Sequence, residues 1–415
     1  MTNTDKTTGP GRKGLFRAPD GRNLLAIFAL VTTLFLLWGF CNGLIDILNK
    51  HFQSTLHINK YQSGFVQSAN YLAYFLMAIP AGLLARKFGY KGGIIIGLVL
   101  IAAGAFWFVT ATQIGAYWAF LTGLFILATG MTCLETIANP YTTVLGPSES
   151  GATRINIAQT FNGVGWILGP VVGGYFVFGG TGTAVNAGLY VPYLGIGIVV
   201  TALIGIFAIA KVPDLVAEED VKAEAEGGPK KPLWRRPHFT LGVLTQFLYV
   251  SAQSGIFGFF INYMLENTHG VTPTQAATYL GLFGFGLFMI GRLFGSVVVS
   301  LTKPHWALAV YAAANILLCG IAMLGGQIGL GALLATFFFM SIMFPTIFAL
   351  SIRGLGEHTK LGSSLVVMSI VGGAIAPPLM GHIADVSSMR IGFLVPAACF
   401  VLIAAYGVFW PKLER

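Results

Sequence analysis

Two carboxylic acids interrupt long apolar stretches of this 415-residue chain. Glu135 lies in the middle of TCLETIANPY, residues 132–141, and Asp46 lies in WGFCNGLIDIL. A charged side chain at the centre of a bilayer costs at least about 2.5–3.5 kcal/mol on insertion scales. Acids that are kept despite this cost usually face a water-filled path and bind a proton or another cation. We therefore expect Asp46 and Glu135 to load and release a coupling ion.

Amides and aromatic rings accompany both acids at helical spacing. Trp38, Asn42 and Asp46 follow one another at intervals of four residues. Thr132, Glu135 and Asn139 follow one another at intervals of three and four residues. Each set therefore shares one helix face. Amides both donate and accept hydrogen bonds, and aromatic faces pack against the C–H face of a sugar ring. A cavity lined in this way suits a neutral polyol better than a charged or apolar substrate. The candidate substrate-binding residues are Trp38, Asn42, Gln67, Asn70, Asn139, Gln159, Asn162 and Gln253.

Several of these residues also have a simpler interpretation. An Asn or Gln within a membrane helix can bond a neighbouring helix, and Asp46, near the predicted outer end of its segment, can be structural. Arg292 and Arg353 are predicted to lie near cytoplasmic ends, where they would orient the chain and not bind substrate. His382 and Asp385 in HIAD have no third partner for a metal or catalytic site. The four cysteines all lie in apolar segments and predict neither a disulfide framework nor metal-ligand spacing.

The elements that must position these residues are membrane-spanning helices. Hydrophobic residues make up 55% of the chain and charged residues only 9%, whereas soluble domains carry about 25% charged residues. Each of the apolar segments is long enough to cross a hydrocarbon core of about 30 Å. The sequence predicts an all-α polytopic fold with twelve spans, at residues 24–48, 63–85, 92–112, 117–145, 156–178, 189–210, 240–266, 274–301, 305–325, 328–352, 362–384 and 390–410.

Basic residues predict the orientation of these spans. With the N-terminus in the cytoplasm, 21 of the 24 Lys and Arg residues fall in cytoplasmic segments, as the positive-inside rule expects. The net charge of +9 is then a topology signal and not evidence of nucleic-acid binding. The apolar run that begins at Leu24 is too long for a signal peptide and has no small-residue cleavage site, so we expect it to remain as the first span.

One long polar break divides the spans six and six. We expect an N-terminal tail at 1–23, a first half at 24–210, a linker at 211–239, a second half at 240–411 and a tail at 412–415. GWILGPVVGGYFV, residues 165–177, and GGAIAPPLMGHIA, residues 372–384, carry small residues, Pro and Gly at matching offsets. Two such halves are the layout of the major facilitator superfamily. Gly and Pro allow the close helix contacts and bends that rocking of the halves requires.

The chain resembles the fucose–galactose–glucose/proton symporter family of that superfamily, over residues 24 to 410. The stretches that carry the resemblance are LLWGFCNGLIDILNKHF, QSANYLAYFLMAIPAG, CLETIANPYTTVLGP, RINIAQTFNGVGW, SIMFPTIFALSIRGLG and GSSLVVMSIVGGAIAPP. The resemblance implies a multi-pass transporter of a bacterial inner membrane, with both termini cytoplasmic, acting as a monomer without a cofactor. It also implies that Asp46 and Glu135 are protonated in turn, with Glu135 beside the sugar and Gln159 in contact with it.

The sequence departs from the family at a few informative positions. Ile45 replaces the Asn that precedes the first acid in the fucose branch, and the glucose/galactose branch often has LQ at Leu134–Glu135. Ala85, in PAGLLARKFGYKGG, replaces the Asp usual in the gating-loop motif of the superfamily. The substrate is left open among L-fucose, glucose, galactose, mannose and N-acetylglucosamine, and the coupling ion between H⁺ and Na⁺.

These features predict a transport mechanism, and three other classes of protein are weighed against it. Burial favours the neutral form of a carboxyl group, so protonation of Glu135 would remove the cost of closing the cavity around a sugar. The alternatives are a drug exporter, which would need a more apolar cavity, and a non-transporting sugar sensor, which would carry a larger cytoplasmic tail. An enzyme is disfavoured because the chain shows no convincing nucleophile–base pair or metal cluster.

Overall fold

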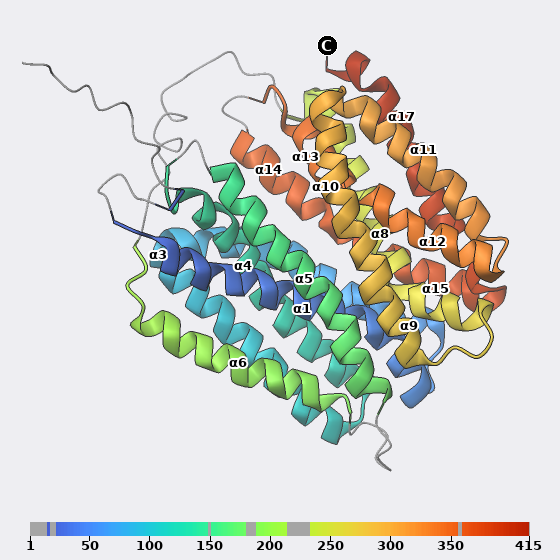
Figure 1. Cartoon of the computed structure of the whole chain (residues 1–415), viewed down its shortest axis with the longest axis horizontal. Coiled ribbons are helices and arrows are strands. Elements are labelled where there is room, and N and C mark those ends of the chain that lie inside the picture. The colour runs from blue at the N-terminus through green and yellow to red at the C-terminus, as the bar shows by residue number, and fades with distance from the viewer. Residues whose placement is uncertain are drawn as a thin grey trace, which may run out of the picture.

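The computed structural model describes residues 15–16, 22–147, 151–179, 188–213, 233–355 and 359–414. Within these ranges the chain forms helices and no β-strand (Figure 1). The first part contains α1 (Leu25–Thr55), α2 (Lys60–Ser63), α3 (Phe65–Ile114), α4 (Tyr117–Val144), α5 (Gly151–Phe178) and α6 (Tyr190–Ile209). The second part contains η2 (Leu233–Arg235), α8 (Pro237–Asn267), α9 (Pro273–Tyr279), η3 (Leu280–Phe285), α10 (Gly286–Leu301), α11 (Pro304–Ala322), α12 (Gly326–Met340), α13 (Met343–Ile352), α14 (Thr359–Met368), η5 (Ser369–Ala374), α15 (Ala376–Val386), α16 (Met389–Gly392) and α17 (Leu394–Leu413). The all-α prediction is confirmed.

Eleven helical segments of the described chain are long and apolar enough to cross a membrane. One of them, Lys60–Ile114, has 55 residues, which at about 1.5 Å per residue is far longer than one crossing. It is interrupted at Gly89, whose φ of 69° and ψ of 177° are not helical and are open essentially to glycine alone. The backbone of Ala85 then lies close to Gly93 on the other side of the bend. This segment therefore forms two antiparallel spans, and the described residues make the twelve crossings that the sequence predicts.

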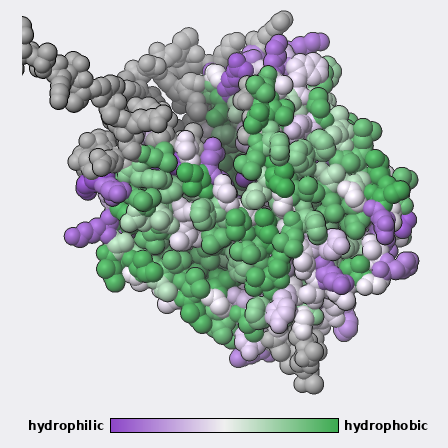
Figure 2. All heavy atoms as spheres, in the orientation of Figure 1, coloured by the Kyte–Doolittle hydropathy of each residue, from purple (hydrophilic) through white to green (hydrophobic). Residues whose placement is uncertain are grey.

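The outer surface of the bundle is apolar, as contact with lipid requires. Large hydrophobic side chains such as Ile209, Leu301 and Ile328 are mostly exposed. Figure 2 shows hydrophobic residues over most of the visible face, with hydrophilic ones gathered towards its ends. An apolar surface of this extent marks a membrane-facing protein.

The helices gather into two groups that follow the chain (Figure 1). In the first, α3 packs against α4 and α6, and α1 packs against α5; in the second, α11 packs against α12 and α17, and α8 packs against η5, α13 and α17. Most of the predicted linker lies outside the described residues, so the division into two halves stays a prediction that these groups support. The first helix of the second group begins at Pro237, three residues before its predicted start.

Glycines bring α1 and α5 into backbone contact. A Cβ on Gly169 would lie 2.7 Å from the Gly43 Cα, and a Cβ on Gly165 would strike the backbone of Leu36 and Phe40. Small residues that admit this approach are a common basis of helix packing in membranes. In the second group, Gly372 approaches the Phe247 carbonyl oxygen of α8 in the same way. The two Gly- and Pro-rich stretches noted in the sequence thus make close contacts in both groups.

The two groups meet at one end of the bundle, which we call the sealed end: α2, the last turns of α1 and α8, and α15. The Asp385 carboxylate accepts hydrogen bonds from the backbone N–H groups of Lys60 (3.1 Å) and Tyr61 (2.9 Å) at the start of α2. The Lys60 ammonium lies 2.6 Å from the Glu266 carboxylate. Since a helix start has unsatisfied N–H groups and favours negative charge, Asp385 of one group holds α2 of the other.

This contact gives a test of what keeps the sealed end closed. Asp385→Asn removes the charge and leaves one acceptor oxygen for two N–H donors, so we expect the closed arrangement to lose about 1.5 kcal/mol, roughly tenfold in the population ratio. Spin labels placed at the exposed residues His57 and His269 would report the distance across this end by double electron–electron resonance spectroscopy. Long distances should become more populated in Asp385→Asn and stay unchanged in Glu414→Gln. Identical distance distributions for all three proteins would show that Asp385 does not hold this end.

Candidate functional site

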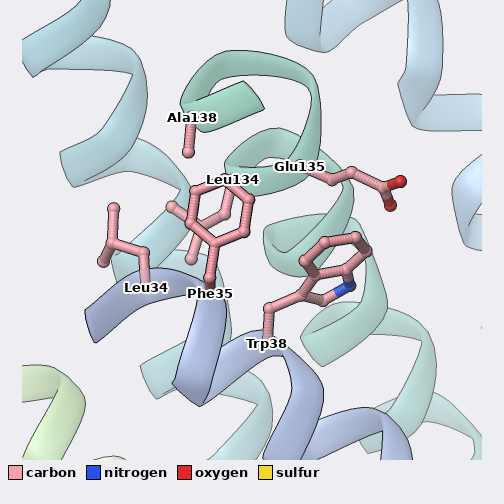
Figure 3. Close-up of a pocket in the computed structure, with 6 residues that line it drawn as sticks. All are labelled: Leu34, Phe35, Trp38, Leu134, Glu135 and Ala138. Carbon is pink, nitrogen blue, oxygen red and sulfur yellow. The ribbon is translucent and has the colours of Figure 1, made fainter. Parts of the chain in front are cut away.

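Glu135 lies in a cluster of aromatic and amide side chains within the first group of helices. It lines a small recess between α1 and α4 together with Leu34, Phe35, Trp38, Leu134 and Ala138. Figure 3 shows the Glu135 carboxyl group and the Trp38 ring extending to the same side, away from the apolar residues of the recess. The Trp38 indole N–H donates to the Tyr74 hydroxyl at 2.8 Å, and this hydroxyl lies within hydrogen-bonding reach of the Glu135 carboxyl. Three helices therefore surround this one acid.

The cluster extends one turn along α4 and across to α5. The Asn139 amide donates to the Glu135 carbonyl oxygen at 3.0 Å and accepts a hydrogen bond from the Gln159 amide, also at 3.0 Å. All three side chains are only partly buried. They present donors and acceptors next to an aromatic ring, which is the combination that the sequence predicted for a polyol site.

Asp46 lies elsewhere, in the seam between the two groups of helices. One of its carboxyl oxygens accepts a hydrogen bond from the Gln67 amide at 2.8 Å, and the other has no partner among the described residues. The Gln67 amide nitrogen also lies 3.1 Å from where a Cβ on Gly258 of α8 would be. One turn further on, the Asn49 amide donates to the Gly258 carbonyl oxygen at 3.1 Å. Asp46 is 4% exposed, so here the seam encloses it.

α1 is longer than the sequence predicted, so Asp46 lies further from the end of its helix than expected. α1 continues to Thr55, seven residues beyond its predicted end at Leu48, and nine residues beyond Asp46. The spacing of eight residues between Trp38 and Asp46 corresponds to about 12 Å along the helix axis. The two acids consequently occupy different environments, Glu135 beside the recess and Asp46 close to the sealed end.

The other predicted site residues differ in how far they are exposed and in whether their amide groups are already hydrogen-bonded. Gln253 of α8 is partly exposed and lies within hydrogen-bonding reach of the Tyr249 hydroxyl. Asn70 is buried with its amide oxygen unpaired among the described residues. The Asn42 amide donates to the Trp38 carbonyl oxygen at 3.0 Å, and that of Asn162 donates to the Phe35 carbonyl oxygen at 3.1 Å. The simpler interpretation, that an amide bonds a neighbouring helix, applies to Asn162 of α5, whereas Asn42 bonds the backbone of its own helix.

Two tyrosines of α3 complete the site and were not among the candidate substrate-binding residues. Tyr74 links Trp38 to Glu135, and Tyr71 lies within electrostatic range of both acids and of Tyr249 in α8. The Tyr71 ring also contacts Gly373 of η5, where a Cβ would come within 2.4 Å of it. Tyr71 and Tyr74 follow Gln67 and Asn70 at helical spacing, and this spacing was the signal that could have identified both.

Comparison with known proteins places the chain in a family. The family model described as Major Facilitator Superfamily matches residues 25–370. The chain belongs to the major facilitator superfamily. It is therefore a multi-pass membrane transporter and not an enzyme, and its twelve crossings are those of this fold.

The similar members of the superfamily extend over nearly the whole chain. It is 39% identical to the L-fucose-proton symporter of Escherichia coli (strain K12), covering 99% of this chain and 98% of that protein. It is 38% identical to a glucose/galactose transporter of Brucella abortus, covering 93% and 94%. Among solved structures, FucP in the outward conformation matches with a TM-score of 0.67 at 39% identity, covering 94% of this chain and 99% of that one. A D-xylose-proton symporter matches with a TM-score of 0.76 at 12% identity, which shows the fold alone.

The hydrogen bond between Trp38 and Tyr74 can be tested directly. Tyr74→Phe leaves a partly buried indole N–H without its acceptor, so we expect the free energy of unfolding in detergent to fall by about 1–3 kcal/mol. Tyr190→Phe, which changes an exposed tyrosine of α6, is the control and should leave this free energy unchanged. Equal losses in the two variants, or none in either, would show that the hydroxyl of Tyr74 does not organise the site.

Proposed function

We propose that this transporter couples the uptake of a neutral monosaccharide, L-fucose or a hexose such as glucose, galactose or mannose, to the entry of protons. The observation that carries the proposal is the position of Glu135, a membrane-embedded acid next to Trp38 and to the Asn139–Gln159 amide pair. An acid that changes charge couples ion flow, and the neighbouring groups bind a neutral polyol. The names of the relatives, a fucose-proton symporter and glucose/galactose transporters, agree with both assignments.

The surroundings of the two acids favour a proton over sodium. Within the described residues, the polar groups beside the two carboxyl groups are neutral: a tyrosine hydroxyl lies within hydrogen-bonding reach of Glu135, and a glutamine amide bonds Asp46. A single carboxyl group with such partners can bind a proton by itself, whereas sodium needs several oxygen ligands around it. The sodium-coupled uptake of a hexose or of N-acetylglucosamine is the alternative that the experiment below distinguishes.

The orientation follows from the charge distribution. With the basic segments in the cytoplasm, α1 runs outward, and the sealed end faces the outside of a bacterial inner membrane. The structure is then inward-facing, and a TM-score of only 0.67 to FucP in the outward conformation, at 39% identity, agrees with a different arrangement of the halves. Figure 2 shows the surface hollowed between the two groups of helices near the upper edge of the view, away from the sealed end. The proposed transporter works as a monomer.

The geometry suggests an order of events. In the outward-facing state the sealed end is open, so water reaches Asp46 and Glu135 and both acids can take a proton. The sugar then binds between Trp38 and the amides beside Glu135. Because a neutral acid is cheaper to enclose than a charged one, protonation permits the halves 24–210 and 240–411 to close around the sugar. The Asp46–Gln67 pair and Asn49 then meet Gly258, and the site opens to the cytoplasm.

Glu135→Gln tests this role. The amide keeps the shape of the side chain but cannot release a proton, so we expect accumulation of sugar against a gradient to be lost while exchange of labelled for unlabelled sugar continues. Uptake would be measured in sodium-free, lightly buffered vesicles with an imposed proton gradient, with external pH recorded as each sugar of a panel is added. Glu414→Gln, at the end of the chain, is the matched control and should accumulate sugar normally.

The same measurement separates the alternatives. Alkalinisation by one sugar, absent in Glu135→Gln, would establish proton symport and identify a substrate. Uptake that appears only when sodium is added would replace the proton by sodium. Accumulation by Glu135→Gln at the wild-type level would show that Glu135 is not the coupling residue.

A further inference from the structure

Arg292 is a cation within a membrane-spanning helix. It was predicted to lie near the cytoplasmic end of its span, but α10 continues for nine residues beyond it, to Leu301. This is about 13 Å along the helix axis. Its Nε is buried and has no hydrogen-bond partner among the described residues. An ionisable side chain retained at such a position marks a functional site by default.

The immediate surroundings of Arg292 do not neutralise it. The guanidinium carbon lies 5.1 Å from the centre of the Phe288 ring, and the hydroxyl of Tyr249 in α8 lies within electrostatic range. That hydroxyl is itself engaged with the Met340 carbonyl oxygen at 2.9 Å. The two ion pairs that the structure records among described residues, Lys60–Glu266 and Arg353–Glu414, involve other groups. The guanidinium thus keeps hydrogen-bond donors for something else.

The register of two antiparallel helices shows what Arg292 faces. Three contacts follow one another along the seam between α5 and the α9–η3–α10 segment: Gly174 with Ala277, Ile167 with Gly281, and Gly163 with Met289. As the residue number falls along α5, it rises along the α9–η3–α10 segment, so the two run antiparallel. One further turn therefore pairs Gln159, four residues before Gly163, with Arg292, three residues after Met289. These spacings keep each residue on the same helix face as the contact before it.

The first half's polar cluster is thus level with Arg292 across the seam. Gln159 bonds Asn139, which in turn bonds the backbone of Glu135. Gln159 and Arg292 are each partly accessible, whereas Gly174, Gly281 and Ala277 on the same seam are buried or tightly packed towards the sealed end. A sugar held by this polar cluster would therefore face Arg292 across the seam.

We propose that Arg292 is the second half's contribution to the substrate site, donating hydrogen bonds to hydroxyl oxygens of the sugar that Gln159 and Glu135 hold from the first half. The proposal rests on sugar transport by this chain. A guanidinium carries only donors, whereas the protonated carboxyl group of Glu135 and the amide of Gln159 both donate and accept. Sugar hydroxyls donate and accept, so a ring held between these groups would satisfy both halves at once. Arg292 would then help determine which sugar is selected, through the hydroxyl that faces it.

The experiment compares sugar binding by purified wild-type protein, Arg292→Gln, Arg292→Lys and the control Arg353→Gln. Arg353 lies in an exposed ion pair with Glu414 at the end of α13. Dissociation constants would be measured by isothermal titration for the transported sugar and for its series of single-deoxy analogues. We expect Arg292→Gln to weaken binding of the parent sugar about tenfold or more and Arg353→Gln to change it less than twofold.

The deoxy series separates a contact from a structural effect. In the wild type, the analogue that lacks the hydroxyl facing Arg292 should bind about tenfold more weakly than the parent sugar, and in Arg292→Gln this difference should vanish. Arg292→Lys keeps the charge but not the planar fork of donors, so it should retain part of this difference in affinity. If Arg292→Gln does not fold, the comparison of Arg292→Lys with the wild type provides the test. Unchanged affinity, or an equal loss for every sugar in the series, would overturn the assignment. A wild-type protein that binds no sugar of the panel would instead refute the proposed function itself.

Discussion

The free-energy cost of enclosing a charged carboxyl group away from water is the constraint on which this transporter depends. Two acids, Asp46 and Glu135, lie in helices whose outer faces are as apolar as lipid. Among the described residues no ion pair joins either acid to a basic side chain. A tyrosine hydroxyl lies within hydrogen-bonding reach of Glu135, and a glutamine amide bonds Asp46. Such partners orient a carboxyl group without compensating its charge in a medium of low dielectric constant. The proposed cycle therefore ties closure of the protein to the neutral form of each acid.

The architecture gives the two acids different tasks under that constraint. Glu135 belongs to one group of helices, beside Trp38 and the amides that a sugar would contact. Asp46 lies in the seam, where Gln67 and Asn49 meet Gly258 of the other group. Glycines allow this close packing in both groups of helices, because the α1–α5 crossing and the approach of α8 to α1 and α3 each leave no room for a Cβ. Glu135 can thus respond to the substrate, while Asp46 responds to whether the seam is closed.

The sequence predicted the helices, the two acids and most of the amides, because apolar length and helical spacing are local properties. It did not predict the contacts between segments that lie far apart in the chain. Asp385, dismissed as a chemical site, satisfies the start of α2 some 325 residues away, and Arg292, interpreted as a topology signal, lies level with Gln159. Asn162 has the composition of a binding residue, yet its amide is engaged with the Phe35 carbonyl oxygen. Only the packing of the helices distinguishes an amide that joins two helices from one that faces a cavity.

The protonation of Glu135 upon sugar binding is the central claim, and infrared difference spectroscopy tests it most directly. Sugar would be added to purified protein in detergent at a pH where the unliganded acid is ionised, and the carboxylic acid C=O stretching band would be recorded. We predict a gain in this band with wild-type protein that shifts on exchange into ²H₂O and is absent in Glu135→Gln. Saturating sugar binding without any change in this band would contradict the account, because the site would then enclose its substrate without neutralising the acid.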